Sequence, residues 1–233
     1  MGGGGSGAGS SGAGVGGVGG DGRGGSAAAS GDRGTGGTAG TAATGGGGGG
    51  ALGSGGSAGS PAPAPVPVPG DLAIVELLTN PASTDTGREW IEVLNKTTHA
   101  LSLAGMHIAD AANDAAVDFT AGGGLLDAGK RAVFVQSADA TKNGGITLGA
   151  MFAGGSFGTL VSLNNDADSI SVCVGPCATG VLIDRVTWDA GLGTGYDGHA
   201  VSIDDAGRRC PATQPFGDGG SFGTPGGPNG TCP

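Results

Sequence analysis

Short apolar runs separated by turn residues fill the chain from residue 72 onward. Residues 72–78, Leu-Ala-Ile-Val-Glu-Leu-Leu, are apolar except for one acid, which predicts a buried first strand. Residues 89–95, Glu-Trp-Ile-Glu-Val-Leu-Asn, predict a second strand. Side chains alternate along a strand. One face of this strand therefore carries Glu89, Ile91 and Val93, and the other carries Trp90, Glu92 and Leu94.

Later segments have the same short apolar character. We expect further strands at residues 99–103, 106–108, 132–135, 159–163, 168–174, 181–188 and 200–203. Gly-Pro and Thr-Gly turn signals between 168–174 and 181–188 favour a hairpin. Glycine-rich residues 144–158 predict a long loop, and residues 109–115 are too short and too closely flanked by strands for a helix. About nine short strands with frequent turns predict an all-β sandwich.

The chain changes in character near residue 70. Residues 1–60 are almost entirely Gly, Ala, Ser and Thr, without an aromatic residue and with four charges that cancel. Such a segment has too little apolar surface to offset the entropy of ordering it, so we predict a disordered tether over 1–60. Proline at every second position of 61–69 predicts an extended polyproline spacer over 61–70. The folded domain is then expected at 71–233.

The charge of the chain restricts its partners. The net charge is −10, and the ten basic residues are scattered along the sequence. A nucleic-acid surface needs clustered Lys and Arg, so no nucleic-acid partner is expected. No run of 18 apolar residues is present for a membrane span. Met1 is followed by glycines and not by a signal peptide, and we hypothesise that Met1 stands where a bacterial lipoprotein has its lipidated cysteine.

Several motifs, in a constant order along the chain, resemble those of lamin-tail domains of the bacterial secreted type. They are an acid in the first apolar strand, the Glu-Trp-Ile-Glu-Val-Leu-Asn strand, a Leu-x-Leu-x-Gly corner at 101–105, a Leu-x-x-Gly turn at 126–129, a Leu-Asn-Asn-x-x-Asp-Ser-Ile strand entry at 163–170, an Asp-x-Val-x-aromatic strand at 184–188, and Thr-Pro-Gly-Gly-Pro-Asn at 224–229. The signature residues are Glu76, Glu89, Trp90, Glu92, Asn95, Leu103, Gly105, Gly129, Asp184, Thr224, Pro225, Gly226 and Asn229.

The resemblance implies an immunoglobulin-like β-sandwich and a non-catalytic binding or tethering module without a cofactor. It further implies a secreted or cell-surface location. The partner would be another envelope or extracellular macromolecule, either protein or polysaccharide, with membrane contact only through an N-terminal lipid anchor. The basic surface on which nuclear lamin tails depend for chromatin contact is missing, and no coiled-coil rod precedes the domain.

Four cysteines in an exported domain suggest two disulfides. Three pairings are compatible with the sequence. We favour Cys173–Cys177, because Gly175-Pro176 reverses the chain between them, and this leaves Cys210–Cys232 to fix the C-terminal segment. Zinc ligation is the rival interpretation, but only one pair has a spacing near that of zinc sites.

The carboxylates offer an alternative function. Loop aspartates Asp110, Asp114, Asp166 and Asp168 are weak calcium candidates, because calcium prefers oxygen ligands. With them, the chain would be a calcium-dependent accessory or hydrolytic module. Glu89 and Glu92 face opposite sides of one strand, which argues against an acid/base pair and favours a structural role. The three histidines, His99, His107 and His199, show no ligand spacing and are interpreted as surface or turn residues.

Overall fold

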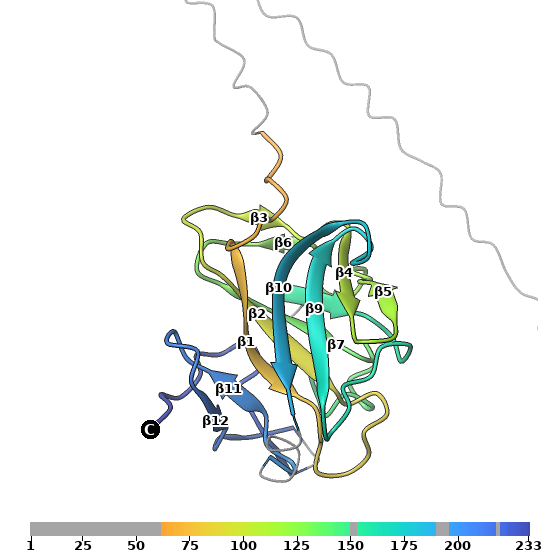
Figure 1. Cartoon of the computed structure of the whole chain (residues 1–233), viewed down its shortest axis with the longest axis vertical. Coiled ribbons are helices and arrows are strands. Elements are labelled where there is room, and N and C mark those ends of the chain that lie inside the picture. The colour runs from red at the N-terminus through yellow and green to blue at the C-terminus, as the bar shows by residue number, and fades with distance from the viewer. Residues whose placement is uncertain (1–61, 150–152, 190–195, 218–219) are drawn as a thin grey trace, which may run out of the picture. The chain divides into compact units, whose positions relative to one another are not determined.

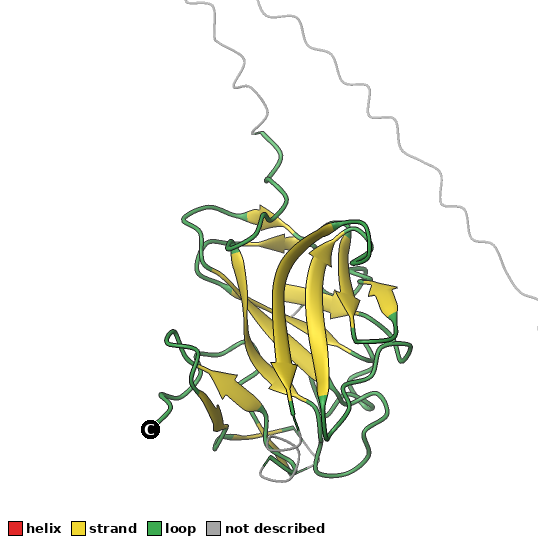
Figure 2. Ribbon diagram, in the orientation of Figure 1, coloured by secondary structure: helices red, strands yellow, loops and turns green. Residues whose placement is uncertain are grey.

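The computed structural model describes residues 62–149, 153–189, 196–217 and 220–233. The predicted disordered tether over 1–60 lies outside these residues. Within them the structure holds fourteen strands and no helix (Figure 2). No helix long and apolar enough to cross a membrane occurs in this part of the chain.

Six strands form the larger sheet, in the order β12-β11-β1-β2-β7-β8 (Figure 1). All neighbours are antiparallel except β7 and β8, which are parallel. Their bounds are Leu72–Leu78 for β1, Trp90–Asn95 for β2, Arg131–Val135 for β7, Ala153–Ser156 for β8, Val201–Ile203 for β11 and Arg209–Pro211 for β12.

Four antiparallel strands form the second sheet, in the order β10-β9-β4-β5. Two further pairs, β3 with β6 and β13 with β14, are two residues long per strand. The bounds are Leu101–Ser102 for β3, Met106–Ala109 for β4, Asp114–Ala116 for β5, Leu125–Leu126 for β6, Asp168–Val174 for β9, Val181–Trp188 for β10, Pro215–Phe216 for β13 and Ser221–Phe222 for β14.

The main core lies between the two sheets, as expected of an all-β immunoglobulin-like sandwich. Ile91 and Val93 belong to it, together with Phe134 from β7 and Ile170 and Val172 from β9. Trp90, on the opposite face of β2, belongs to a second cluster. The face assignment made from the alternation of residues 89–95 is therefore confirmed.

The second cluster covers the outer face of the six-stranded sheet. Trp90, Leu78, Val133 and Val135 from the sheet pack there against Ile146, Leu148, Ala200 and Ala212, with Phe216 partly buried beside them. The rings of Trp90 and Phe216 meet edge to face, with centroids 5.7 Å apart. Both faces of this sheet are thus buried, which explains why β1 and β2 read as nearly continuous apolar runs.

The strand predicted at 159–163 is wrong. Val161 and Leu163 are buried in the main core, but the segment pairs with no strand. Its backbone groups are instead bound by side chains: Leu163 N donates to Glu89 (2.9 Å), and Gln136 Nε2 donates to Val161 O (3.1 Å). The apolar alternation reflected burial without strand pairing.

The loop predicted over 144–158 is also incorrect in part, because it contains β8. A Cβ on Gly154 would lie 1.9 Å from Val133 O, and one on Gly155 would lie 2.5 Å from Asp118 O. These glycines allow the strand to approach its neighbours closely. The short strands β5, β6 and β12 to β14 were not predicted, since two or three residues are too few to show a period.

Part of the polyproline segment packs on the domain. Pro67 is buried, and Pro65 O accepts a hydrogen bond from Ser102 N of β3 (2.7 Å). The backbone therefore contacts the sandwich several residues before β1 begins.

Candidate functional site

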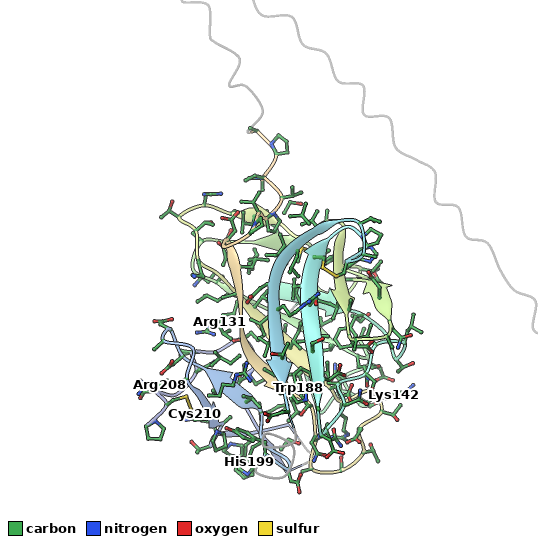
Figure 3. The ribbon with its side chains drawn as sticks, viewed as in Figure 1. Arg131, Lys142, Trp188, His199, Arg208 and Cys210 are labelled. Carbon is green, nitrogen blue, oxygen red and sulfur yellow. A yellow bond between two sulfur atoms is a disulfide. The ribbon has the colours of Figure 1, made fainter. Side chains whose placement is uncertain are left out.

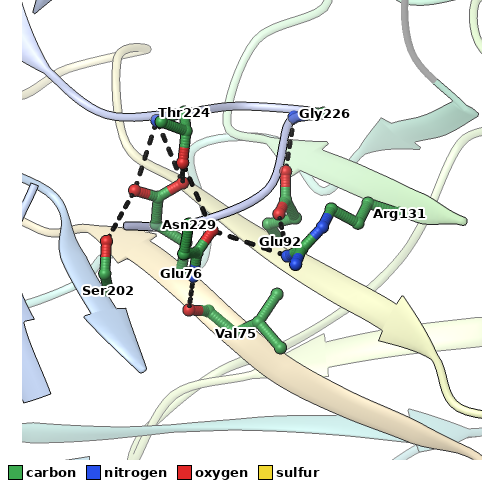
Figure 4. A network of polar contacts seen from close by, with 8 residues as sticks. All are labelled: Val75, Glu76, Glu92, Arg131, Ser202, Thr224, Gly226 and Asn229. Carbon is green, nitrogen blue, oxygen red and sulfur yellow. Dashed lines mark hydrogen bonds and ion pairs between the residues drawn. The ribbon is translucent and has the colours of Figure 1, made fainter. Parts of the chain in front are cut away.

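Two glutamates lie opposite each other on the outer face of the six-stranded sheet. Glu76 of β1 and Glu92 of β2 are Cα partners in the ladder, next to a register irregularity between Ile74 and Glu76. Both side chains are 0 % exposed. They face the C-terminal segment, which crosses over them between residues 224 and 229 (Figure 4).

Glu76 accepts hydrogen bonds from two residues. Thr224 approaches with its backbone N (3.1 Å from Oε2) and its hydroxyl (2.9 Å from the same oxygen). Ser202 of β11 donates its hydroxyl to Oε1 (3.1 Å). The carboxylate therefore connects β1 to a neighbouring strand and to a segment 148 residues later in the chain.

Glu92 holds the next part of the same segment. Its Oε2 accepts the Gly226 N–H, and its Oε1 pairs with Arg131 Nη1 of β7 at 2.8 Å. Asn229 completes the arrangement, because its Nδ2 donates to Val75 O (2.5 Å) and its Oδ1 lies 3.5 Å from Arg131 Nη1 (Figure 4).

The electrostatics of the pair follow from burial. Burial raises the pKa of Glu92 to about 8, although the Gly226 N–H and Arg131 oppose the change and the neighbouring Glu76 reinforces it. Burial likewise raises the pKa of Glu76 against the hydrogen bonds from Thr224 and Ser202. Both carboxyl groups are closed off from solvent and engaged by the protein itself. Both bind the C-terminal segment.

A groove with a volume of about 770 Å³ lies beside this cluster. We call it the C-terminal groove. Ser202 and Thr224, which both contact Glu76, belong to its walls, and Ile146 and Phe216 supply apolar surface. Among the described residues that line it, none carries a charged side chain. Figure 3 marks Cys210, another of its lining residues, near the C-terminal end.

Glu89 forms a separate buried site at the start of β2. Its Oε2 accepts from Gln136 Nε2 (2.7 Å) and from Leu163 N (2.9 Å). Gln136 in turn accepts the Gly87 N–H at 2.6 Å. Burial raises the pKa of Glu89 to about 8, against the Leu163 N–H, and the charge of Asp85 adds to the increase.

Other signature residues stabilise turns or connect the two sheets. Asn95 Nδ2 donates to His99 O (2.9 Å) and Leu126 O (3.0 Å), which fixes the turn after β2 against β6. Asp184 accepts the Ile74 N–H (2.7 Å) and so links β10 of one sheet to β1 of the other. Gly105 adopts φ +75°, a conformation that favours glycine.

The remaining signature residues have simpler roles. Leu103 is fully buried in the main core, and Gly129 adopts φ +67°. Pro225 lines the C-terminal groove. The structure thus brings Glu76, Glu92, Thr224, Gly226 and Asn229 together and distributes the rest over the domain.

The calcium candidates are held separately. Asp110 accepts backbone N–H groups from Ala112 (2.7 Å) and Ser162 (3.1 Å), and Asp168 accepts from Asn164. Asp114 contacts His107, and Asp166 is exposed. In the described part of the chain, no three His, Cys, Asp or Glu residues form a group that could hold a metal ion.

Both expected disulfides are present. Cys173 and Cys177 are joined across a separation of four residues, and Cys210 and Cys232 across 22. The first ties the end of β9 to the β9–β10 turn, and the second ties β12 to the C-terminal segment.

Sequence reasoning missed three functional contacts. Arg131 pairs with Glu92, Ser202 binds Glu76, and His107 binds Asp114. The first two depend on strand register, for which no local signal exists. The third depends on β5, which is three residues long and is too short to show a period. His107 lies in β4 and is not a turn residue.

Comparison with known proteins agrees with the motifs. A family model described as Lamin Tail Domain matches residues 65–190, more than half of the 233-residue chain. The match begins within the polyproline segment and ends before the residues that bind Glu76 and Glu92 from the C-terminal side. No curated protein and no solved structure gives a significant match.

Proposed function

The chain belongs to the lamin tail domain family, and we propose that it is an exported, non-catalytic binding module whose immunoglobulin-like domain is presented on an N-terminal tether. The burial of Glu76 and Glu92 carries the proposal. Raised pKa values would suit these groups to acid/base chemistry, yet both are sealed beneath the C-terminal segment and bound by it, and Glu89 is likewise buried.

The location is supported by the covalent structure. Two disulfides in one small domain are typical of proteins that fold in an oxidising compartment. The Gly-rich composition of 1–60 fits a spacer between an anchor and a domain. Fractionation of the native host, with detection by an antibody against the domain, tests this part. Recovery in the cytoplasm with free thiols contradicts it.

The binding surface in this proposal is the C-terminal groove, and its ligand is an uncharged polysaccharide. The volume of about 770 Å³ suits a segment of a few sugar rings. Its lining is uncharged in a domain of net negative charge, which disfavours polyanions. Gln214 and Thr231, both exposed in the lining, offer amide and hydroxyl groups to sugar hydroxyls, and Phe216 offers a ring face or edge.

Affinity electrophoresis of the full chain in gels that contain neutral or acidic polysaccharides tests the ligand class. We expect retardation by at least one neutral polymer and none by acidic polymers. The double variant Gln214→Ala/Thr231→Ala should lose the retardation, and Thr179→Ala, an exposed threonine in the β9–β10 turn, should keep it. Equal retardation of all three proteins, or none by any neutral polymer, overturns the assignment of the groove.

A further inference from the structure

A disulfide, a histidine and an aspartate meet on the outer face of the four-stranded sheet. Ile170 and Val172 of β9 point into the main core, so Cys173 points to the outer face. His107 of β4 is the Cα partner of Cys173 in the antiparallel ladder. Residues paired in this way have their side chains on the same face, with Cβ atoms about 5 Å apart.

Asp114 joins the histidine to the second cysteine. Its Oδ1 lies 2.6 Å from His107 Nδ1, and its Oδ2 accepts the Cys177 N–H at 2.5 Å. A carboxylate can only accept a hydrogen bond, so Nδ1 carries the proton and Nε2 is the free basic nitrogen of the neutral ring. One carboxylate therefore orients the imidazole and fixes the turn that carries Cys177.

The two sulfur positions differ in access. Cys173 is 0 % exposed, whereas Cys177 is partly exposed between the exposed residues Pro176 and Ala178. On the other side of Cys173, its partner in β10 is Leu182, which is 42 % exposed beside Val181 at 46 %. The disulfide thus lies between a His–Asp pair and an exposed apolar patch.

We propose that Cys173–Cys177 is a redox-active disulfide that exchanges with external thiols, with His107 as its acid–base partner. The incoming thiol transfers its proton to His107 Nε2, and the resulting thiolate attacks Cys177 Sγ. The sulfur–sulfur bond breaks, its electrons go to Cys173 Sγ, and the imidazolium formed at His107 returns the proton to the Cys173 thiolate. A second thiol then attacks the mixed disulfide, so two thiols are oxidised to one disulfide while the protein gains two thiols.

The second disulfide of the chain serves as an internal comparison. Cys210 is partly exposed, as Cys177 is, and Cys232 is 5 % exposed, so the two disulfides differ in their surroundings and not in access. Cys232 Sγ lies near the backbone oxygens of Ser202 and Arg208. Arg185 is a further charged residue on the outer face around Cys173, and its Nε donates to Ser171 Oγ at 2.8 Å. The inference goes beyond the proposed binding role and does not depend on it.

The test is reduction of the full chain by glutathione in native buffer, with timed alkylation and peptide mass spectrometry of each cysteine pair. We expect Cys173–Cys177 to open at least about tenfold faster than Cys210–Cys232 and to re-form when oxidised glutathione is added. His107→Gln should slow the first reaction about tenfold, and His99→Gln, an exposed histidine outside this cluster, should leave it unchanged. Near-ultraviolet circular dichroism checks that each variant is folded.

Two results would overturn the proposal. One is reduction of both disulfides at the same rate in the unaltered chain, which needs no variant to interpret. The other is a rate in His107→Gln equal to that in His99→Gln.

The thiol that reacts with this disulfide could belong to another protein or to a small molecule. Reduction by a cysteine peptide with apolar flanking residues, compared with reduction by glutathione, distinguishes the two. If the peptide reduces Cys173–Cys177 faster than glutathione does, and Leu182→Ser removes this advantage, the partner is a protein thiol. Equal rates for the two reductants indicate a small-molecule thiol.

Discussion

Glu76 and Glu92 lie directly opposite each other on β1 and β2, and each binds a different residue of the same C-terminal loop. Glu76 receives Thr224 and Glu92 receives Gly226. The pair therefore uses two buried carboxyl groups on a sheet face to attach a segment that lies outside the family match.

Replacement of Thr224 by valine tests the attachment. Thr224→Val keeps the shape of the side chain but removes the hydroxyl that donates to Glu76 at 2.9 Å. Because a buried carboxyl acceptor loses one of its hydrogen-bond donors, we expect a loss of about 2 kcal/mol in the free energy of unfolding. Urea denaturation measures it, with Thr98→Val at an exposed turn position as control. Equal stability of the two variants contradicts the role given to Glu76.

The buried glutamates predict an unusual pH dependence. The pKa of Glu89 and of Glu92 is about 8 in the folded domain and near 4.5 in the unfolded chain. Between these values the folded state binds more protons, so the stabilisation is fully present below pH 4.5 and is lost as the pH rises through 8. We expect the free energy of unfolding to fall by up to a few kcal/mol between pH 5 and pH 9.

Urea titrations at pH 5, 7 and 9 measure this dependence. Glu89→Gln keeps the size of the side chain and removes one titrating group, so its stability should change less with pH than that of the unaltered chain. A free energy of unfolding that increases toward pH 9 would falsify the raised pKa values.

Gly223 is expected to be intolerant of a side chain. A Cβ there would lie 2.9 Å from Trp90 Cζ2 and 3.2 Å from the ring of Phe216. Because Trp90 is fully buried and already meets Phe216 edge to face, an added methyl group would force these rings to shift, and Gly223→Ala should cost about 1–3 kcal/mol. Gly230→Ala is the matched control, since its Cβ would meet nothing within 4 Å. Thermal unfolding followed by tryptophan fluorescence compares the two.

The disulfides should contribute unequally to stability. Cys210–Cys232 closes a loop of 22 residues and Cys173–Cys177 one of four. Loop-closure entropy gives about 3 kcal/mol for the longer loop and about 2 kcal/mol for the shorter. We expect the double alanine variant at 210 and 232 to lose more stability in urea than the one at 173 and 177. The reverse order would show that loop entropy does not govern the effect.

Several strands could be read from the sequence because their periodicity is local. The bounds of β1, β9 and β10 agree with those predicted, and the hairpin of β9 and β10 was expected from its turn residues. Residues 159–163 failed the same reasoning, because the polar groups that bind this backbone come from Glu89 and Gln136, which are distant in sequence.

The sequence by itself determined the all-β class and the faces of β2, since alternation and turn residues act over a few residues, and it favoured the Cys173–Cys177 disulfide without excluding the other pairings. Only the tertiary structure decided what the acids do. Glu76 meets Thr224 across 148 residues, Glu92 meets Arg131 through strand register, and Asp114 becomes the partner of His107 and Cys177. Such contacts arise when folding excludes water and leaves each buried carboxylate to find its donors within the protein, and no local pattern specifies which donors those are.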